Sequence, residues 1–256
     1  MSRERILITG GADGLGREMA LGYAARDCEV LVLDVDQEKG TELAQHEAIR
    51  FREFDLARFE ELTVTWDDEP PFDRIIMNAG ISAFGNFAEI AWEKQQAVID
   101  INFTGHLRLL HQLLGMDKLQ EKGRLAFVLS AAAFTPIPVT ATYAASKAAL
   151  EAFGHSIEPW LMHRGISVTL VYPGQMRTAH LRKYYGNENA DAGIPPDVIA
   201  DRILKGMDRR SRHLYPDAMS KVFRFLATTI PWAMPTLIYR FNRKRFAEML
   251  YPDLVE

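Results

Sequence analysis

The sequence is poor in cysteine and shows no pattern of a secreted protein. Cys28 is the single cysteine among 256 residues, so the chain cannot close an internal disulfide, and such usage is typical of a reducing compartment. The first residues run directly into an apolar segment without the apolar region of a signal peptide. We therefore expect a cytoplasmic location.

The sequence also has no excess of positive charge and no metal-ligand pattern. Its 30 Lys and Arg residues stand against 34 Asp and Glu residues, and the net charge of -4 argues against a nucleic-acid partner. His106 and His111 are five residues apart, so they do not share one face of a helix. No group of His, Cys and Asp residues has zinc-site spacing. We expect no metal and no nucleic acid.

The sequence contains no run that we expect to cross a membrane. Residues 225–239 form an uncharged stretch of 15 residues, fewer than the ~20 that span a bilayer, and Pro231 and Pro235 interrupt it. Around it, residues 202–245 contain eleven Lys and Arg residues against two acidic ones. Three interpretations stay open for residues 219–245: a peripheral contact with anionic lipid at the inner membrane surface, a lid over a long hydrophobic substrate, or packing against the core or a second subunit.

Short apolar runs alternate with longer amphipathic segments through most of the chain. This alternation is typical of strands joined by crossover helices, and runs that are apolar almost throughout indicate a parallel sheet covered on both faces. With 48% apolar and 25% charged residues, the composition fits one domain over residues 1–256, ending in a helical, apolar and basic extension at about 217–256. The predicted strands are residues 6–8, 30–33, 49–54, 75–77, 125–129, 168–171 and 213–216.

A glycine-rich turn follows the first predicted strand. Gly10, Gly14 and Gly16 lie between that strand and a predicted helix, where they allow a tight turn, close approach of the backbone to a pyrophosphate, and an anion at the helix amino end. Asp34 ends the second strand 18 residues after Gly16, near the ~20 expected of a carboxylate that binds ribose hydroxyls.

The acidic residues near this turn favour NAD over NADP. The Asp34 carboxylate would repel a 2'-phosphate, and no Arg or Lys stands among the next three residues to compensate. Asp13 adds a second acid within the turn itself. For Asp36, we expect an amino cap of the next helix.

Ser130, Tyr143 and Lys147 form the candidate catalytic group. Ser130 ends a strand, and Tyr143 and Lys147 are four residues apart at the start of a predicted helix, so they share one helical face. The ammonium favours the phenolate, and we expect it to lower the pKa of Tyr143 from about 10 toward neutral pH. Tyr143 is then a candidate general acid and base, and the Ser130 hydroxyl a group that holds a carbonyl or alkoxide oxygen.

Taken together, these motifs resemble the short-chain dehydrogenase/reductase family over roughly residues 4–178. The segment from Thr9 to Gly16 matches the family pattern Thr-Gly-x-x-x-Gly-x-Gly, Tyr143 and Lys147 match Tyr-x-x-x-Lys, and Ser130 lies 13 residues before the tyrosine. The resemblance implies a doubly wound Rossmann fold with a mostly seven-stranded parallel sheet. It also implies hydride transfer with NAD, in which Lys147 holds the nicotinamide ribose.

The resemblance implies further site residues. Asn102 looks like the fourth member of a catalytic tetrad, which holds a water bridged to the lysine. Asp55 looks like the adenine-contacting aspartate, with a helix cap as its other interpretation. Met77 departs from many relatives, which have a second asparagine there. The cofactor-binding residues carried over are Gly10, Asp13, Gly14, Leu15, Gly16, Asp34, Asp55, Leu56, Asn78, Ala79, Gly80, Tyr143, Lys147, Pro173, Gly174 and Thr178.

The substrate is predicted from one uncharged segment. Phe134 and residues 136–139 lie between the serine and the tyrosine, and they favour an apolar alcohol or ketone unless they only pack within the loop. Residues 179–193 are a candidate lid. The resemblance suggests a homodimer or homotetramer. Two other functions stay open: an NADP-linked ketoacyl reductase, and a dinucleotide-binding sensor without turnover.

Overall fold

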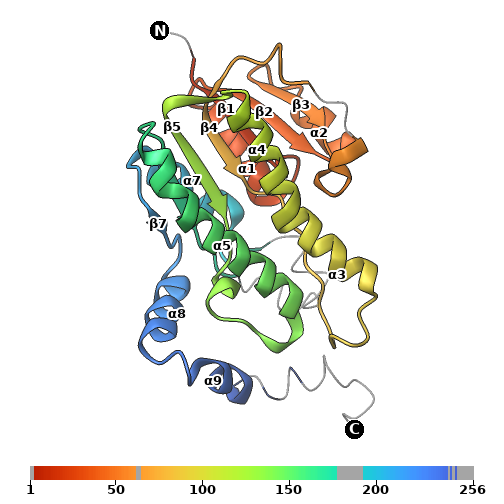
Figure 1. The fold of residues 1–256 in the computed structure, drawn as a ribbon, viewed down its shortest axis with the longest axis vertical. Helices are drawn as coiled ribbons and strands as arrows, with labels where there is room; N and C mark the ends of the chain where they lie inside the picture. The colour runs from red at the N-terminus through yellow and green to blue at the C-terminus, as the bar shows by residue number, and fades with distance from the viewer. Residues whose placement is uncertain (1–2, 62–64, 178–192, 242, 244–245, 247–256) are drawn as a thin grey trace.

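A computed structural model describes residues 3–61, 65–177, 193–241, 243 and 246 of the chain. They form an α/β structure around a seven-stranded sheet with the order β3-β2-β1-β4-β5-β6-β7 (Figure 1). Every pair of neighbouring strands is parallel, which confirms the predicted sheet. The strands are β1 (Arg5–Thr9), β2 (Glu29–Asp34), β3 (Ile49–Glu53), β4 (Phe72–Met77), β5 (Leu119–Val128), β6 (Ser167–Val171) and β7 (His213–Leu214).

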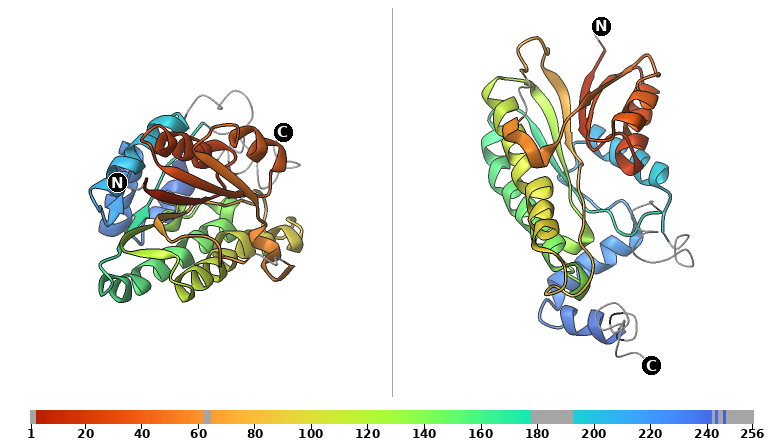
Figure 2. Two further views of the ribbon diagram at one scale, coloured as in Figure 1. Left: turned by 90° about the horizontal axis from the view of Figure 1, so that it is seen from above. Right: turned by 90° about the vertical axis from the view of Figure 1, so that its right-hand side faces the viewer.

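Helices cover both faces of the sheet (Figure 2). On one face, Ile8 of β1 packs in a buried cluster with Met19. On the other face, Leu7 packs with Leu109, because successive side chains of a strand point in opposite directions. The first layer contains α1 (Gly14–Ala24), α2 (Gln37–Leu43) and α7 (Pro196–Asp208), and the second contains α3 (Trp92–Ile99), α4 (His106–Gly115) and α5 (Ala141–Met162).

The strand order reverses between β1 and β4. From β1 the chain continues outward to β2 and β3, then returns to β4 on the other side of β1. The turns that follow β1 and β4 therefore lie next to each other at the carboxyl edge of the sheet. Open α/β sheets bind ligands at such a switch point.

The carboxyl-terminal extension begins with two helices, α8 (Ala218–Thr229) and α9 (Met234–Phe241). They lie beyond the carboxyl ends of the strands, away from the amino terminus (Figure 1). Within the described ranges, no helix is both long and apolar enough to cross a membrane. Thr178 and all but the last residue of the candidate lid 179–193 lie outside the described residues.

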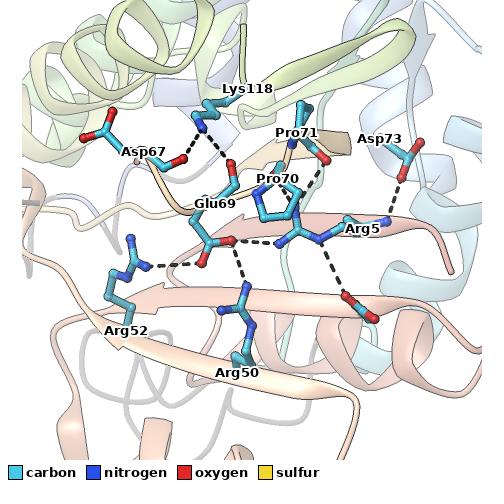
Figure 3. A network of polar contacts seen from close by, with 10 residues as sticks. Arg5, Arg50, Arg52, Asp67, Glu69, Pro70, Pro71, Asp73 and Lys118 are labelled. Carbon is cyan, nitrogen blue, oxygen red and sulfur yellow. Dashed lines mark hydrogen bonds and ion pairs between the residues drawn. The ribbon is translucent and has the colours of Figure 1, made fainter. Parts of the chain in front are cut away.

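The buried carboxylate of Glu69 binds the arginines of the edge strand β3. Glu69 is 5% exposed and accepts hydrogen bonds from Arg5 at 2.8 Å, Arg50 at 2.8 Å and Arg52 at 3.2 Å (Figure 3). Its backbone carbonyl accepts a further bond from Lys118 at 2.7 Å. Burial acts to raise the pKa of Glu69, but the bonds from Arg50 and Arg5 outweigh it and leave this pKa below its ordinary value.

We expect the Glu69→Gln variant to lose about 2 kcal/mol of unfolding free energy, because it removes the charge that several arginines share. A depressed carboxyl pKa stabilises the protein above the unfolded-state pKa, and this stabilisation disappears as the pH falls below about 5. Urea unfolding between pH 7 and pH 3 should therefore show the gap between wild type and variant closing with acid.

Glu47→Gln is the matched control, since Glu47 is exposed in the turn before β3. Its unfolding curve should follow that of the wild type at each pH. An equal loss of stability in the two variants, or a gap that stays constant down to pH 3, would contradict the role given to Glu69.

Candidate active site

A cavity of about 380 Å³ opens at the carboxyl edge of the sheet, beside the turns after β1 and β4. It is lined by almost all of the residues that the sequence predicts for cofactor binding and catalysis. Those residues are Gly10, Asp13, Gly14, Leu15, Gly16, Asp34, Asp55, Leu56, Asn78, Ala79, Gly80, Ser130, Tyr143, Lys147, Pro173 and Gly174. The fold thus brings together groups from seven separate parts of the chain.

The glycine turn is closely packed. Gly10 has a φ of +63°, which L side chains rarely adopt, and a Cβ atom on Gly16 would lie 2.0 Å from the Gly10 carbonyl oxygen. Asn78 holds the turn by donating hydrogen bonds to the carbonyls of Thr9 at 3.0 Å and Gly10 at 2.9 Å. The backbone is therefore open to a ligand at the amino end of α1, as a pyrophosphate requires.

Asp34 is fixed at the end of β2. One carboxylate oxygen accepts the backbone N–H of Ala12 at 2.9 Å, and the other accepts that of Asp36 at 3.1 Å. Asp36 also caps α2, as predicted, because its side chain accepts the N–H of Lys39. Asp55 accepts the N–H of Ala57 at 2.8 Å, which is the capping role that the sequence left as an alternative.

A lysine stands beside the glycine turn, where the sequence analysis expected only acids. The Lys39 ammonium lies 2.7 Å from the Asp13 carboxylate and 3.4 Å from that of Asp36. The hydrogen bond from Lys39 is the main reason that the pKa of Asp13 is lowered. Lys39 therefore offsets the charges of Asp13 and Asp36, while the Asp34 carboxylate lies in the cavity wall.

Ser130 and Tyr143 meet at the inner end of the cavity. Ser130 follows β5 and accepts the backbone N–H of Ala132 at 3.1 Å, while Tyr143 lies in the first turn of α5. Burial raises the pKa of the Tyr143 phenol, and a hydrogen bond from the Ser130 side chain opposes this shift. The predicted decrease of this pKa is therefore wrong, because desolvation outweighs the hydrogen bond with Ser130.

Lys147 is buried beneath the tyrosine. Its ammonium donates to the carbonyl of Val128 at 2.8 Å and lies 5.9 Å from the centre of the Tyr143 ring. Burial lowers the pKa of Lys147 to about 8, so the group still carries positive charge at neutral pH. A Cβ atom on Gly80 would lie 3.2 Å from both the Lys147 ammonium and Asn102 Oδ1, and so Gly80 leaves room for these two groups.

Asn102 lies behind the cavity and does not line it. It belongs to a π-helical segment, Asp100–Gly105, that joins α3 to α4, and it is completely buried. Its side chain exchanges hydrogen bonds with the backbone of Ile81 at 2.8 and 2.9 Å and donates to Ser146 at 3.0 Å. Ser146 in turn donates to the Tyr143 carbonyl at 2.7 Å. Asn102 thus links the β4 turn to the tyrosine helix, and its bridging water stays a prediction.

His106, which the sequence analysis considered only as a candidate metal ligand and excluded as one, lies directly behind the glycine turn. It is fully buried and joins Thr9 of the glycine turn at 3.1 Å to the Asn102 carbonyl at 3.2 Å. Burial, followed by the charge of Lys147, lowers its pKa to about 3, so the imidazole is neutral. Because a carbonyl can only accept, His106 Nδ1 carries the proton. In the sequence, the only sign of this role is that His106 lies one helical turn after Asn102.

The predicted substrate segment does not line the described cavity. Phe134 packs instead against the rings of Tyr172 at 5.6 Å and Tyr215 at 6.4 Å, and Val139 is 1% exposed in the core. Loop packing, the alternative left open by the sequence, is what these two residues do. Apolar side chains from other places line the cavity, and among those that the sequence analysis did not name are Ile81, Ile101 and Met176.

The family of the chain follows from a comparison with family models. The model described as short chain dehydrogenase matches residues 4–189. The chain belongs to the short-chain dehydrogenase family. An oxidoreductase of Myxococcus xanthus is 31% identical over 193 residues, which are 70% of this chain and 74% of that protein. The protein is therefore an oxidoreductase of this family.

Solved structures of short-chain dehydrogenases have the same fold. One from Burkholderia cenocepacia, solved with NADP, has a TM-score of 0.81 at 20% identity and covers 93% of this chain and 98% of its own. Another from Burkholderia phymatum, solved with NAD, has a TM-score of 0.77 at 15% identity and covers 90% of this chain and 95% of its own. At these identities the likeness concerns the fold, and short-chain dehydrogenases with either dinucleotide share it.

Proposed function

We propose that this protein is an NAD(H)-dependent oxidoreductase that interconverts a secondary alcohol and a ketone on an apolar substrate. One observation carries the proposal: the Ser130 and Tyr143 hydroxyls and the Lys147 ammonium meet in a cavity that continues to the glycine turn. Proton transfer to an oxygen and dinucleotide binding then occur within one site.

In this proposal the cofactor and each of the three catalytic residues have separate roles. A bound nicotinamide supplies or accepts the hydride, which is the chemistry of the cofactor. Tyr143 gives a proton to the substrate oxygen or takes one from it, and Ser130 holds that oxygen by a hydrogen bond. Lys147, buried beside the phenol, favours its ionised form and balances the charge that develops there.

The charges around Asp34 support NAD as the cofactor. A 2'-phosphate would meet the carboxylates of Asp13 and Asp34 in the cavity wall, and the Lys39 ammonium is already bound to those of Asp13 and Asp36. The apolar liners Ile81, Ile101 and Met176 support an apolar substrate. We further propose a single domain over residues 1–256, a cytoplasmic location, and a homodimer or homotetramer, for which the exposed Trp160 and Met162 on α5 offer apolar surface.

The test is turnover measured by NADH absorbance. The protein should oxidise NADH with some members of a panel of apolar ketones, and reduce NAD with the matching secondary alcohols. NADPH should bind at least about tenfold more weakly than NADH. Tight NADPH binding would replace this proposal with an NADP-linked ketoacyl reductase. Dinucleotide binding without turnover on any substrate would replace it with a sensor.

The exposed face of α8 and α9 supports a peripheral membrane contact through residues 219–245. Apolar side chains stand in solvent there, including Phe225 at 66%, Trp232 at 83% and Phe241 at 85% exposure. Residues 218–246 contain six Lys and Arg residues and no acidic residue. A twofold dimer through this face would bring like charges together, whereas an anionic lipid surface complements them.

We expect the wild-type protein to bind vesicles of mixed phosphatidylcholine and phosphatidylglycerol at low salt, with a change in tryptophan fluorescence. The double variant Lys221→Gln/Arg240→Gln should bind about 30-fold more weakly, since each basic residue contributes roughly 1 kcal/mol at an anionic surface. The matched control, Arg209→Gln/Arg210→Gln, removes two charges after α7 and should bind as the wild type does. Wild-type binding that is equal on pure phosphatidylcholine would contradict this electrostatic contact.

A further inference from the structure

Asp217 is a buried carboxylate that the proposed chemistry does not use. It is 5% exposed and precedes α8, where one oxygen accepts the backbone N–H of Ser220 at 2.7 Å. This contact is an ordinary helix amino cap. The second oxygen does something else: it accepts the backbone N–H of Gly174 at 2.8 Å and the Ser220 hydroxyl at 2.9 Å.

The bond to Gly174 fixes one peptide group in the cavity wall. The carbonyl of the Pro173–Gly174 peptide accepts the N–H of Ala131 at 3.1 Å, and the N–H of the same peptide donates to Asp217. Both polar groups of the peptide are therefore held, one by the loop after Ser130 and the other by the start of α8. Because a peptide is planar, these two bonds set its orientation.

The contact is close as well as directional. A Cβ atom on Gly174 would lie 2.9 Å from one Asp217 oxygen and 3.0 Å from the other, so the carboxylate lies directly against the glycine. Pro173 and Gly174 both line the cavity. A shift of the carboxylate therefore moves the cavity wall, whereas a solvent-exposed cap would leave the wall unchanged.

A second anchor holds α8 independently of Asp217. Arg224 lies 3.4 Å from the Glu151 carboxylate and stacks over Phe134 at 5.2 Å and Tyr172 at 5.9 Å. These contacts join α8 to α5 and to the loop after Ser130. Losing the Gly174 bond should therefore change the Pro173–Gly174 turn without releasing the helix.

We propose that Asp217 is a positioning residue that orients the Pro173–Gly174 peptide. This peptide is bonded to the loop after Ser130, so it shapes the end of the cofactor site where the reacting nicotinamide would lie. This inference rests on the proposed function, because it requires that a dinucleotide binds in this cavity. It predicts that Asp217 affects the nicotinamide half of the cofactor, because it bonds to Gly174 in the cavity wall. The adenosine half, which Asp34 would hold, should be unaffected.

The test compares two probes, NADH and ADP-ribose, which lacks the nicotinamide. The Asp217→Ser variant keeps a capping oxygen but has one side-chain oxygen where Asp217 has two, so it cannot cap α8 and hold Gly174 together. We expect NADH to bind about tenfold more weakly and ADP-ribose to bind within about twofold of wild type. The thermal midpoint should stay within a few degrees, and the KM for NADH should rise more than kcat falls.

Ser220→Ala is the matched control, since it removes a hydroxyl from the same group and leaves the backbone bonds of Gly174 and Ser220 to Asp217 in place. It should bind both probes as the wild type does. Unchanged NADH affinity in Asp217→Ser, or an equal loss for both probes, overturns the positioning role. Failure of the wild-type protein to bind either probe overturns the proposed function itself, and the inference with it.

Discussion

The Tyr143→Phe variant should lose about 1,000-fold in kcat while its affinity for NADH stays within about twofold of wild type. The substitution removes only the hydroxyl, so the ring keeps its place in the first turn of α5. Without that hydroxyl, the substrate oxygen has Ser130 as a hydrogen-bond donor but has lost the group proposed to exchange its proton. Stopped-flow or steady-state NADH absorbance with the best substrate of the panel measures this loss.

Tyr172→Phe is the matched control. Tyr172 is also buried, but its hydroxyl donates to the Glu151 carboxylate at 2.8 Å and does not line the cavity. This variant loses a buried hydrogen bond, so it should be less stable and yet turn over substrate at nearly the wild-type rate. Retention of more than about a tenth of the activity in Tyr143→Phe would exclude Tyr143 as the general acid and base.

The Gly16→Ala variant should lose about 100-fold or more in affinity for NADH. The added Cβ atom would meet the Gly10 carbonyl oxygen at 2.0 Å and Asn78 Nδ2 at 2.7 Å. The first of these is a backbone atom, so the clash is relieved only if the glycine turn itself moves. Because we propose that the backbone of this turn approaches the pyrophosphate, fluorescence titration with NADH should detect the change directly.

Gly115→Ala separates this effect from a general consequence of replacing glycine in a helix. A Cβ atom on Gly115, at the end of α4, would meet nothing within 4 Å apart from its chain neighbours and the backbone of its own helix. This variant should bind NADH as the wild type does and have the same or slightly greater stability. Circular dichroism should show both variants folded, and a folded Gly16→Ala protein with wild-type affinity would contradict the packing argument.

The strands show how much of the fold the local pattern of apolar residues predicts. The predicted strands that became β1, β2, β4, β5 and β6 are short apolar runs, and such runs form the centre of a sheet because both of their faces are buried. β5 nevertheless begins at Leu119, six residues before its predicted start, and passes through the exposed Gln120 and Glu121. Its first half is defined by the pairing of Phe72 with Leu119, a contact between distant segments that hydrophobicity does not record.

In the site, too, some features follow from the sequence alone and others from the tertiary structure. The positions of the glycine turn, Ser130, Tyr143 and Lys147 were determined by the sequence, because each motif is short and its spacing on a strand end or a helix turn fixes its geometry locally. Asp34 belongs to the same class, since it ends the strand that pairs with β1. The adjacency of these motifs in one cavity follows from the parallel order of the strands.

Only the tertiary structure decided which groups meet across the fold and how burial changes their charge. It brought Lys39 to Asp13 and Asp217 to Gly174, and it turned Phe134 away from the cavity toward Tyr172. It also raised the pKa of the Tyr143 phenol, where spacing alone predicted a decrease. The physical reason is that desolvation and long-range contacts depend on everything packed around a group, whereas a motif specifies only its neighbours along the chain.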